Sequence, residues 1–284
     1  MPISYDRIMG LDFPERTFTY SDRDTMLYAL SVGMGRDPLD KQELRYTYER
    51  QLRALPSFVT LVAWDDSWIP TTGINEQMIV HGGQQITLHR PLEPAGSVTS
   101  KIRIRDVVDK GEGRGALLLV ETRLRDSATG DEIASLNSTV FARGDGGFGG
   151  PSTSLPAPHR IPDRDPDVVV VSETLPCQAL LYRLLGDRNP LHADPAFAAA
   201  AGFERPILHG LCTYGIANHA VVKAACDYDA ASLAHFEARF TAPVIPGETL
   251  ETSIWQDGKQ VSFQMRKAES GTVVLNNGLA LLRE

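Results

Sequence analysis

The chain has 284 residues, of which 42% are hydrophobic, and its 36 acidic residues outnumber 28 basic ones to give a net charge of -8. This length predicts one large globular domain or two domains of about 140 residues. The acidic balance argues against a broad basic face for nucleic acid or anionic lipid. We therefore expect neither a nucleic-acid partner nor a membrane partner.

The cysteines and the chain ends bear on the cellular compartment. Cys177, Cys212 and Cys226 are odd in number and lack Cys-x-x-Cys spacing, which predicts neither a disulfide framework nor a zinc site. The amino-terminal segment lacks the apolar core of a signal peptide, and no apolar run approaches the roughly 20 residues of a membrane helix. The last residues are not a Ser-Lys-Leu address. Together these features predict a cytoplasmic protein.

A glycine-rich and proline-rich stretch divides the chain into halves of similar length. The sequence GDGGFGG at 144–150 precedes a segment with repeated prolines and little apolar periodicity, as in a linker. Three motifs recur at an offset of 152 residues: Pro38-Leu39 with Pro190-Leu191, Arg53 with Arg205, and Pro-x-x-Pro at 91–94 with 243–246. We therefore predict an N-terminal repeat at 1–150, a linker at 151–170 and a C-terminal repeat at 171–284.

Both halves show the same order of predicted elements. Ser21 and Ser172 are predicted to cap an apolar helical stretch that ends near Gly35 and Gly186. An apolar segment follows at 58–64 and at 211–225, and the second is long enough for a central helix. Strands are predicted near 84–90, 98–109, 115–126 and 132–142, and near 233–241, 249–257, 260–268 and 272–283. This pattern predicts an α+β fold in which an antiparallel sheet wraps one long helix, twice.

The segment 182–210 gathers polar side chains among turn residues, in the sequence YRLLGDRNPLHADPAFAAAAGFERPILHG. Addition of water to an unsaturated thioester needs a base that activates water and an acid that protonates the α-carbon, and Asp187 and His192 suit both tasks. Asn189 and the following proline can bend the chain so that both side chains meet one water. We therefore predict Asp187 and His192 as the catalytic pair, with Asn189 holding the loop.

His209 and Gly210 stand at the start of the long apolar helix of the second half. Unpaired N–H groups and the helix dipole favour developing negative charge at such a position. The Gly210 amide is therefore a predicted oxyanion-hole donor for a thioester carbonyl, and glycine permits close approach of a ligand. For His209 a simple helix-start role is an equally good interpretation.

Other interpretations of these motifs compete with the functional ones. His192-Ala193-Asp194 has the His-x-carboxylate spacing of non-haem iron oxygenases, although those ligands lie on strands of a double sheet. Lys110 in DKGEGRG and His81-Gly82 in HGGQ can belong to ordinary turns, and DKGEGRG lacks the residue order of a P-loop. Phe240 is by default a core aromatic residue.

Taken together, the motifs resemble the hydratase 2 or MaoC-like dehydratase family, most closely the hydratase domain of the peroxisomal multifunctional enzyme of fatty-acid oxidation. The similarity covers nearly the whole chain, through HGGQ, DKGEG, GDGGFGG, YRLLGDRNPLH, GFERPILHGLCTYG and ARFTAPVIPGETL. It implies a double hot-dog fold in which only the second half is catalytic. The sequence agrees, because at the offset of 152 Asp187 falls on Gly35 and His192 on Asp40.

The resemblance also implies roles for individual residues. Asp187 and His192 are the implied catalytic pair, with Asn189 as their support and the Gly210 amide as the oxyanion donor. The residues implied to contact the CoA or acyl portion are His81, Gly82, Lys110 and Phe240. The implied reaction is syn hydration to a (3R)-3-hydroxyacyl-CoA without metal or redox cofactor, CoA being part of the substrate. A homodimer and a degenerate half that makes room for bulky acyl chains are implied as well.

The leading hypothesis is an (R)-specific 2-enoyl-CoA hydratase in β-oxidation of medium-chain or long-chain fatty acids or of sterol or bile-acid side chains. A dehydratase of 3-hydroxyacyl groups on acyl carrier protein, or in polyketide synthesis, would run the same chemistry in reverse and would select a protein-bound thioester. A non-catalytic acyl-thioester-binding subunit is the third alternative. The presence of Asp187, Asn189 and His192 argues against it.

Overall fold

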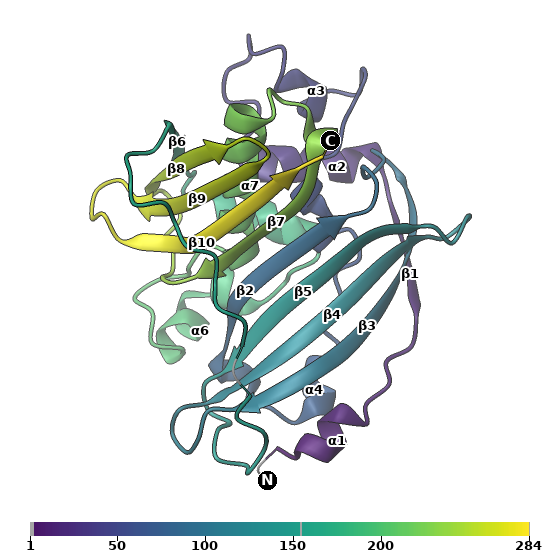
Figure 1. Cartoon of the computed structure of the whole chain (residues 1–284), viewed down its shortest axis with the longest axis vertical. Coiled ribbons are helices and arrows are strands. Elements are labelled where there is room, and N and C mark those ends of the chain that lie inside the picture. Colours follow the sequence, from purple (N-terminus) through teal and green to yellow (C-terminus); the bar gives the residue numbers. More distant parts are fainter. Residues whose placement is uncertain (1–2, 154, 284) are drawn as a thin grey trace.

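The framework of the protein is one antiparallel sheet of ten strands in the order β1-β3-β4-β5-β2-β7-β10-β9-β8-β6 (Figure 1). The computed structural model describes residues 3–153 and 155–283, so residues 1, 2, 154 and 284 of the predicted repeats and linker lie outside it. The strands are β1 (Arg16–Tyr20), β2 (Ile79–Leu88), β3 (Gly96–Asp109), β4 (Ala116–Asp126), β5 (Glu132–Ala142), β6 (Val168–Glu173), β7 (Leu233–Phe240), β8 (Thr249–Asp257), β9 (Gln260–Lys267) and β10 (Val273–Leu282).

The two halves of the sheet meet edge to edge where β2 pairs with β7. Gln85 lies opposite Glu237, and these two residues are separated by the same 152 residues as the sequence repeat. Outward from this seam the strand order is equivalent on both sides, from β5 and β10 to β1 and β6 at the edges. The predicted pair of hot-dog repeats and the eight predicted strands are thereby confirmed.

The helices are short apart from two. They are α1 (Tyr5–Met9), α2 (Asp22–Ser31), α3 (Leu44–Thr47), α4 (Ile69–Thr72), α5 (Gln178–Tyr182), α6 (Pro195–Ala200) and α7 (Gly210–Ala225), with 3-10 turns η1 (Pro56–Thr60), η2 (Glu76–Met78), η3 (Arg183–Leu185), η4 (Pro190–His192) and η5 (Ala230–Ser232). The central helix α7 packs against the sheet of the second half (Figure 1). Within the described part of the chain, no helix is long and apolar enough to cross a membrane.

A long central helix in the first half, which the repeat predicted, does not form. The segment that should supply it, 58–64, begins in the 3-10 turn η1 and continues as a loop before α4. Val59, Ala63 and Trp64 of this segment line a cavity. The first repeat thus has the sheet without a long central helix. Residues of the segment that should form this helix line an internal cavity instead.

Three further expectations differ from the structure. Ser21 does cap α2, through a capping box with Asp24, but Ser172 lies inside β6 and caps no helix. The edge strands β1 and β6 were not predicted. Because β6 begins at Val168, the last three residues of the predicted linker 151–170 belong to the sheet.

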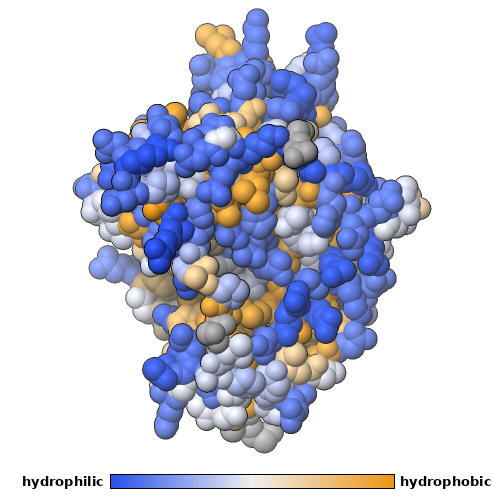
Figure 2. All heavy atoms as spheres, in the orientation of Figure 1, coloured by the Kyte–Doolittle hydropathy of each residue, from blue (hydrophilic) through white to orange (hydrophobic). Residues whose placement is uncertain are grey.

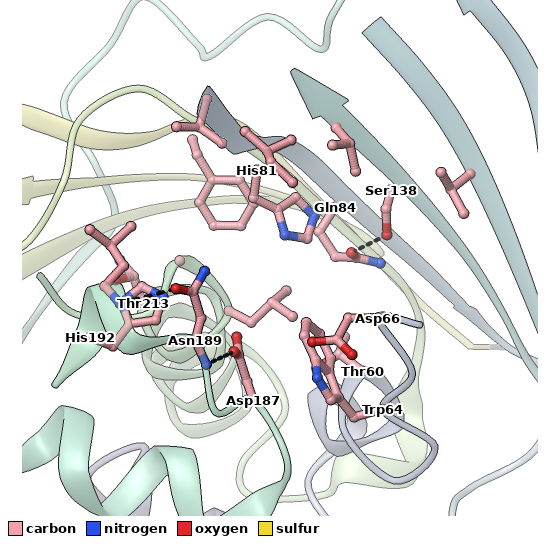
Figure 3. A pocket seen from close by; sticks show the side chains of 18 of the residues that line it. Thr60, Trp64, Asp66, His81, Gln84, Ser138, Asp187, Asn189, His192 and Thr213 are labelled. Carbon is pink, nitrogen blue, oxygen red and sulfur yellow. Dashed lines mark hydrogen bonds between the residues drawn. The ribbon is translucent and has the colours of Figure 1, made fainter. Parts of the chain in front are cut away.

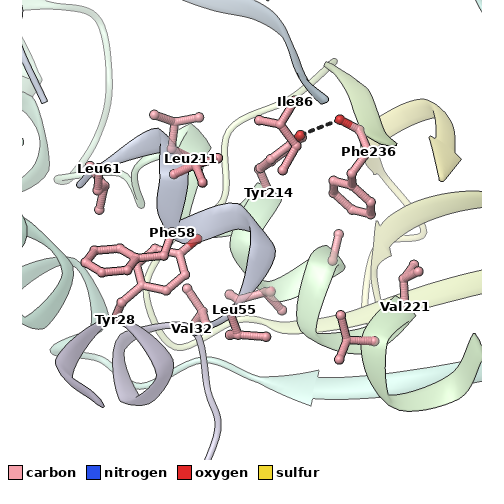
Figure 4. Close-up of a cluster of buried hydrophobic side chains, with 14 of the residues drawn as sticks. Tyr28, Val32, Leu55, Phe58, Leu61, Ile86, Leu211, Tyr214, Val221 and Phe236 are labelled. Carbon is pink, nitrogen blue, oxygen red and sulfur yellow. Dashed lines mark hydrogen bonds between the residues drawn. The ribbon is translucent and has the colours of Figure 1, made fainter. Parts of the chain in front are cut away.

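The main hydrophobic core joins the two halves (Figure 4). The Tyr28 ring stacks on Phe58 with centroids 4.9 Å apart, and its hydroxyl donates to Ser57 Oγ at 2.8 Å. Helix α7 approaches α2 so closely that a Cβ added to Gly215 would lie 2.6 Å from Val32 Cγ1. The start of α7 is therefore held firmly against the N-terminal half.

The linker crosses the outer face of the sheet (Figure 1), and hydrogen bonds fasten this part of the chain to each half of the sheet. Asp109, in the DKGEG motif, accepts N–H bonds from Gly111, Gly147 and Gly149, and thereby ties the glycine-rich loop to the turn between β3 and β4. Farther along, Asn277 Nδ2 donates to the main-chain oxygen of His159 at 2.7 Å. The face that the linker crosses is mostly hydrophilic, with smaller apolar areas between (Figure 2).

Candidate active site

A cavity of about 510 Å³ lies between the N-terminal half and the start of α7. One end is lined by the predicted catalytic residues Asp187, Asn189 and His192 (Figure 3), and Gly210 also lines the cavity. Its remaining wall comes mainly from the inner face of the first-half sheet, with apolar side chains of Ile102, Val120, Leu124, Leu136 and Val140. The predicted catalytic residues therefore lie together in the wall of a chamber that has a large apolar face.

The loop 186–192 gathers its functional side chains through local turns. Gly186 has φ +135°, a conformation open to glycine, and redirects the chain after η3. Asp187 Oδ1 accepts the N–H of Asn189 at 3.1 Å, and Asn189 Oδ1 accepts the N–H of Leu191 at 3.0 Å to cap η4. Polar atoms of Asp187 and His192 consequently lie within 4.8 Å of each other. The two side chains therefore lie close together, and their catalytic role stays a prediction.

His192 is held as a neutral imidazole with one free lone pair. Its Nδ1 lies 2.9 Å from the carbonyl oxygen of Ile207, which can only accept, so Nδ1 carries the proton and Nε2 carries the lone pair. Burial lowers the pKa of His192 to about 4, while the Ile207 bond works in the opposite direction. At neutral pH its Nε2 is therefore a proton acceptor.

Asp187 is a buried carboxylate, with 8% of its surface exposed. Burial raises its pKa to about 6, with a smaller contribution from the negative charge of Asp66, while the N–H of Asn189 works in the opposite direction. Trp64 helps to enclose this region, because a Cβ added to Gly186 would lie 3.2 Å from Trp64 Cβ. The carboxylate is ionised at neutral pH yet far more basic than an exposed aspartate.

Gly210 is the first residue of α7, so its N–H has no acceptor within the helix. The ring of Phe240 covers it, since an added Cβ would lie 3.3 Å from Phe240 Cε1. Both residues line the cavity, as does His81, whose ring centroid is 4.9 Å from that of Phe240. Burial lowers the pKa of His81 to about 4, which leaves this wall uncharged at neutral pH.

Two of the residues that the resemblance assigned to substrate contact lie away from the cavity. Gly82 sits at the irregularity of β2 between His81 and Gly83, and Lys110 is exposed in the turn between β3 and β4. Neither is among the residues that line the cavity. Their contact with CoA stays a prediction.

The arrangement does not favour either metal interpretation. Asp194 Oδ1 accepts the N–H groups of Ala196 and Phe197 as the cap of α6, so it does not complete a His192-x-Asp194 ligand pair. Ligand atoms of Asp187, His192 and His209 lie within 4.8 Å, but the two imidazoles are stacked 3.8 Å apart at 27°. Lone pairs lie in the ring planes, and nearly parallel planes do not direct them at one ion.

Sequence reasoning missed the residues that the first half contributes to the end of the cavity near Asp187. Thr60, Trp64 and Asp66 lie beside Asp187 in Figure 3 and line the same cavity. They lie at the end of η1 and just after it, at least 120 residues before the loop 186–192. No local pattern marks them, because their place depends on packing between the halves.

Comparisons with known proteins agree with this architecture. Residues 18–144 match the family described as MFE-2 hydratase 2 N-terminal domain, and residues 157–277 match the MaoC like domain. The chain is 40% identical to Enoyl-CoA hydratase ChsH3 of Mycobacterium tuberculosis over 99% of both chains, and 42% identical to 3-hydroxyacyl-thioester dehydratase Y of the same organism over 92% of both. A MaoC-like dehydratase from Phytophthora capsici is 36% identical, with TM-score 0.86 and 98% coverage of both chains. The chain thus belongs to the MaoC-like hydratase 2 family of hydro-lyases.

Proposed function

We propose that the protein is an (R)-specific 2-enoyl-CoA hydratase, which adds water in syn fashion to a trans-2-enoyl-CoA and forms a (3R)-3-hydroxyacyl-CoA. One observation carries the proposal: polar atoms of Asp187 and His192 lie within 4.8 Å of each other in the wall of a cavity that Gly210 also lines. His192 Nε2 has a free lone pair, and the Gly210 N–H has no acceptor within α7. Two proton acceptors and one oxyanion donor are the groups that the reaction needs. The substrate partner is accordingly an acyl-CoA.

The steps follow from the protonation states at neutral pH. The thioester carbonyl accepts the Gly210 N–H, which polarises the conjugated double bond. One water molecule donates one hydrogen bond to Asp187 and one to His192 Nε2. Its oxygen attacks C3 of the substrate while one of these two groups takes one proton from it. The electron pair moves to the thioester oxygen as an enolate, which Gly210 stabilises. That proton then passes to C2 on the same face, so one water supplies both new groups and no metal or redox cofactor takes part.

The direct test is hydration of trans-2-decenoyl-CoA by purified protein, with the product trapped by dehydrogenases specific for the (3R) or the (3S) alcohol. Rapid formation of the (3R) product is the expected result. A (3S) product would contradict the assigned geometry. Absence of hydration with both fatty and sterol-type enoyl-CoA esters would contradict the proposed activity.

The pH dependence of kcat/KM is a first prediction, because this ratio reports the pKa values of the free enzyme. The active form has Asp187 ionised, and its pKa is raised to about 6. Activity should therefore be level near neutral pH and fall about tenfold per unit as pH decreases below about 6. A steeper fall is expected near pH 4, where His192 is protonated as well. A rate independent of pH between 5 and 7 would contradict the role of Asp187.

The apolar wall supports medium-chain, long-chain or branched acyl groups as substrates, and this gives a second prediction. Val120 lies on β4, 5% exposed, and lines the cavity. Val120→Phe should lower kcat/KM for decenoyl-CoA about tenfold, because the larger side chain fills the chamber. For crotonyl-CoA, which has only one methyl group beyond the double bond, kcat/KM should change less than threefold. Leu118→Phe is the control, since Leu118 is buried on the same strand but does not line the cavity. Equal losses for both esters would contradict an acyl chain in this chamber.

Dehydration of a 3-hydroxyacyl thioester is a second candidate for the physiological direction. It is favoured by the 42% identity to a relative named 3-hydroxyacyl-thioester dehydratase Y. The same residues serve both directions, so the thioester carrier distinguishes the two roles. Turnover of acyl-carrier-protein esters at least tenfold above CoA esters would favour biosynthetic dehydration, and the reverse preference would favour β-oxidation of fatty acids or sterol side chains.

We also propose a cytoplasmic homodimer as the working form. The net charge of -8 is compatible with a freely diffusing protein. Sedimentation velocity over a hundredfold range of concentration tests the assembly, and a single monomeric species throughout would contradict it.

A further inference from the structure

His209 is the cap residue of α7, and its imidazole is enclosed among the catalytic groups with 1% of its surface exposed. One face of the ring stacks on His192, with centroids 3.8 Å apart and planes at 27°. Tyr182 approaches the ring with a centroid distance of 4.9 Å. The side chain is thus packed between a core tyrosine and the catalytic histidine.

The second contact of His209 reaches the other catalytic residue. Its Nε2 lies 3.3 Å from the main-chain oxygen of Asp187, which can only accept, so Nε2 carries the proton. Its Nδ1 is buried and has no hydrogen-bond partner among the described residues. Burial, with a smaller contribution from His192, lowers the pKa of His209 to about 2, so the ring is neutral at every working pH.

The main chain of His209 is fixed as well. Its carbonyl oxygen accepts the N–H groups of Cys212 and Thr213 at 3.1 Å each, which begins the first turn of α7. The next residue, Gly210, lines the cavity, and its N–H has no acceptor within α7. One residue therefore contacts Asp187 through its side-chain N–H, contacts His192 through its ring face, and sets the position of the Gly210 amide.

We propose that His209 is a positioning residue for the catalytic pair. The stacked ring of His209 blocks rotation of the His192 imidazole about its side-chain bonds, and thereby keeps Nδ1 of His192 on the Ile207 carbonyl. The N–H of His209 holds the main chain of Asp187 at the distance from His192 that one water can bridge. The proposal rests on the hydratase function, because it assigns this alignment to a single reacting water.

Two substitutions separate the two contacts. His209→Phe keeps a flat ring against His192 and removes the N–H, whereas His209→Gln keeps a donor that can reach the Asp187 oxygen and removes the ring. We expect each to lower kcat about tenfold, and His209→Ala to lower it about 100-fold, with KM changed less than threefold, because misplacement by about 1 Å costs about that much. In His209→Gln and His209→Ala, which remove the ring, the fall of kcat/KM below about pH 6 should also move to lower pH as water reaches Asp187.

The matched control is His219→Phe, the same exchange at another buried histidine of α7 that does not line the cavity. It should lose stability and keep the kcat and the pH profile of the natural chain. Equal kcat losses in the two phenylalanine variants, or a natural kcat and pH profile in His209→Phe and His209→Gln, would overturn the proposal.

A readout without substrate keeps this test separate from the proposed function. In ¹⁵N-histidine spectra of the free protein, His192, assigned from the His192→Gln spectrum, should show one tautomer with Nδ1 protonated. His209→Gln and His209→Ala should shift it toward an average of both tautomers, whereas His219→Phe should not. An unchanged His192 signal in His209→Ala would overturn the positioning role even if hydration is confirmed. Lack of hydration by the natural chain would overturn the proposed function alone.

Discussion

Asp187→Asn is expected to lower kcat for enoyl-CoA hydration by about 10³-fold, within the range found when a general base is removed. The asparagine side chain has the same size and its oxygen can still accept the N–H of Asn189, which now bonds to Asp187 Oδ1 at 3.1 Å. It cannot take a proton from water. His192→Gln should lower kcat by a similar factor, because it removes the Nε2 lone pair that is free when Nδ1 bonds to Ile207. Steady-state kinetics with decenoyl-CoA measures both losses.

The stability of Asp187→Asn separates lost chemistry from lost structure. Because burial raises the pKa of Asp187, the folded protein bears an unfavourable buried charge, and its removal should leave the free energy of unfolding equal or higher. Asp194→Asn is the matched control, since Asp194 is exposed and asparagine caps a helix equally well. Turnover by Asp187→Asn within tenfold of that of Asp194→Asn would rule out the assigned base.

Glu43→Gln is expected to lower the free energy of unfolding by about 3 kcal/mol at pH 7, because it breaks a buried ionic cluster. Glu43 is 4% exposed and its Oε1 lies 3.2 Å from His219 Nε2 and 3.7 Å from Lys223 Nζ. Its Oε2 accepts the N–H of Gly35 at 2.7 Å. The cluster joins the N-terminal half to α7, so the loss should appear as one cooperative shift in urea unfolding.

The loss should depend on pH in a defined direction. Burial alone would raise the pKa of Glu43, but the hydrogen bond and charge of His219, the Gly35 N–H and Lys223 together lower it to about 2. A carboxyl with a lowered folded-state pKa contributes its full stability above about 4.5 and loses it as pH falls toward 2. The difference between the natural chain and Glu43→Gln should therefore shrink across this window.

Glu251→Gln provides the comparison for this effect. Glu251 pairs with Arg266 at 2.8 Å on the surface, where both partners are partly exposed, and such pairs contribute less than about 1 kcal/mol. If Glu43→Gln and Glu251→Gln destabilise the protein equally at pH 7, the Glu43 cluster contributes no more stability than an exposed ion pair.

Sequence predicted the sheet well where strands are long and covered on one face. The strands β2–β5 and β7–β10 carry alternating apolar residues and end at glycine or aspartate turns, which are local signals. The edge strands β1 and β6 were not predicted from the sequence, because they are short and pair with a neighbour on one side only. In β6 four consecutive valines give no alternation, and three of them are exposed. The central helix of the first half was predicted from the repeat, yet the chain there forms a turn and a cavity wall.

The catalytic pair could be predicted from the sequence because its residues are close together along the chain. Asp187, Asn189 and His192 lie within six residues, and the turns that orient them are made by Gly186, by the Asn189 side chain and by the proline after it. Gly210 could be predicted for the same reason, since a helix start is a local feature. Short-range hydrogen bonds therefore make a large contribution to these positions.

Only the tertiary structure decided the environment that sets the basicity and alignment of the pair. The Ile207 carbonyl that fixes the His192 tautomer, the His209 ring stacked on it and the Trp64 side chain beside Gly186 come from separate segments. Burial by these segments raises the pKa of Asp187 and lowers that of His192. The sequence by itself determined which residue types stand at the site. Their protonation states depend on burial, and burial arises only when the two repeats pack around these residues.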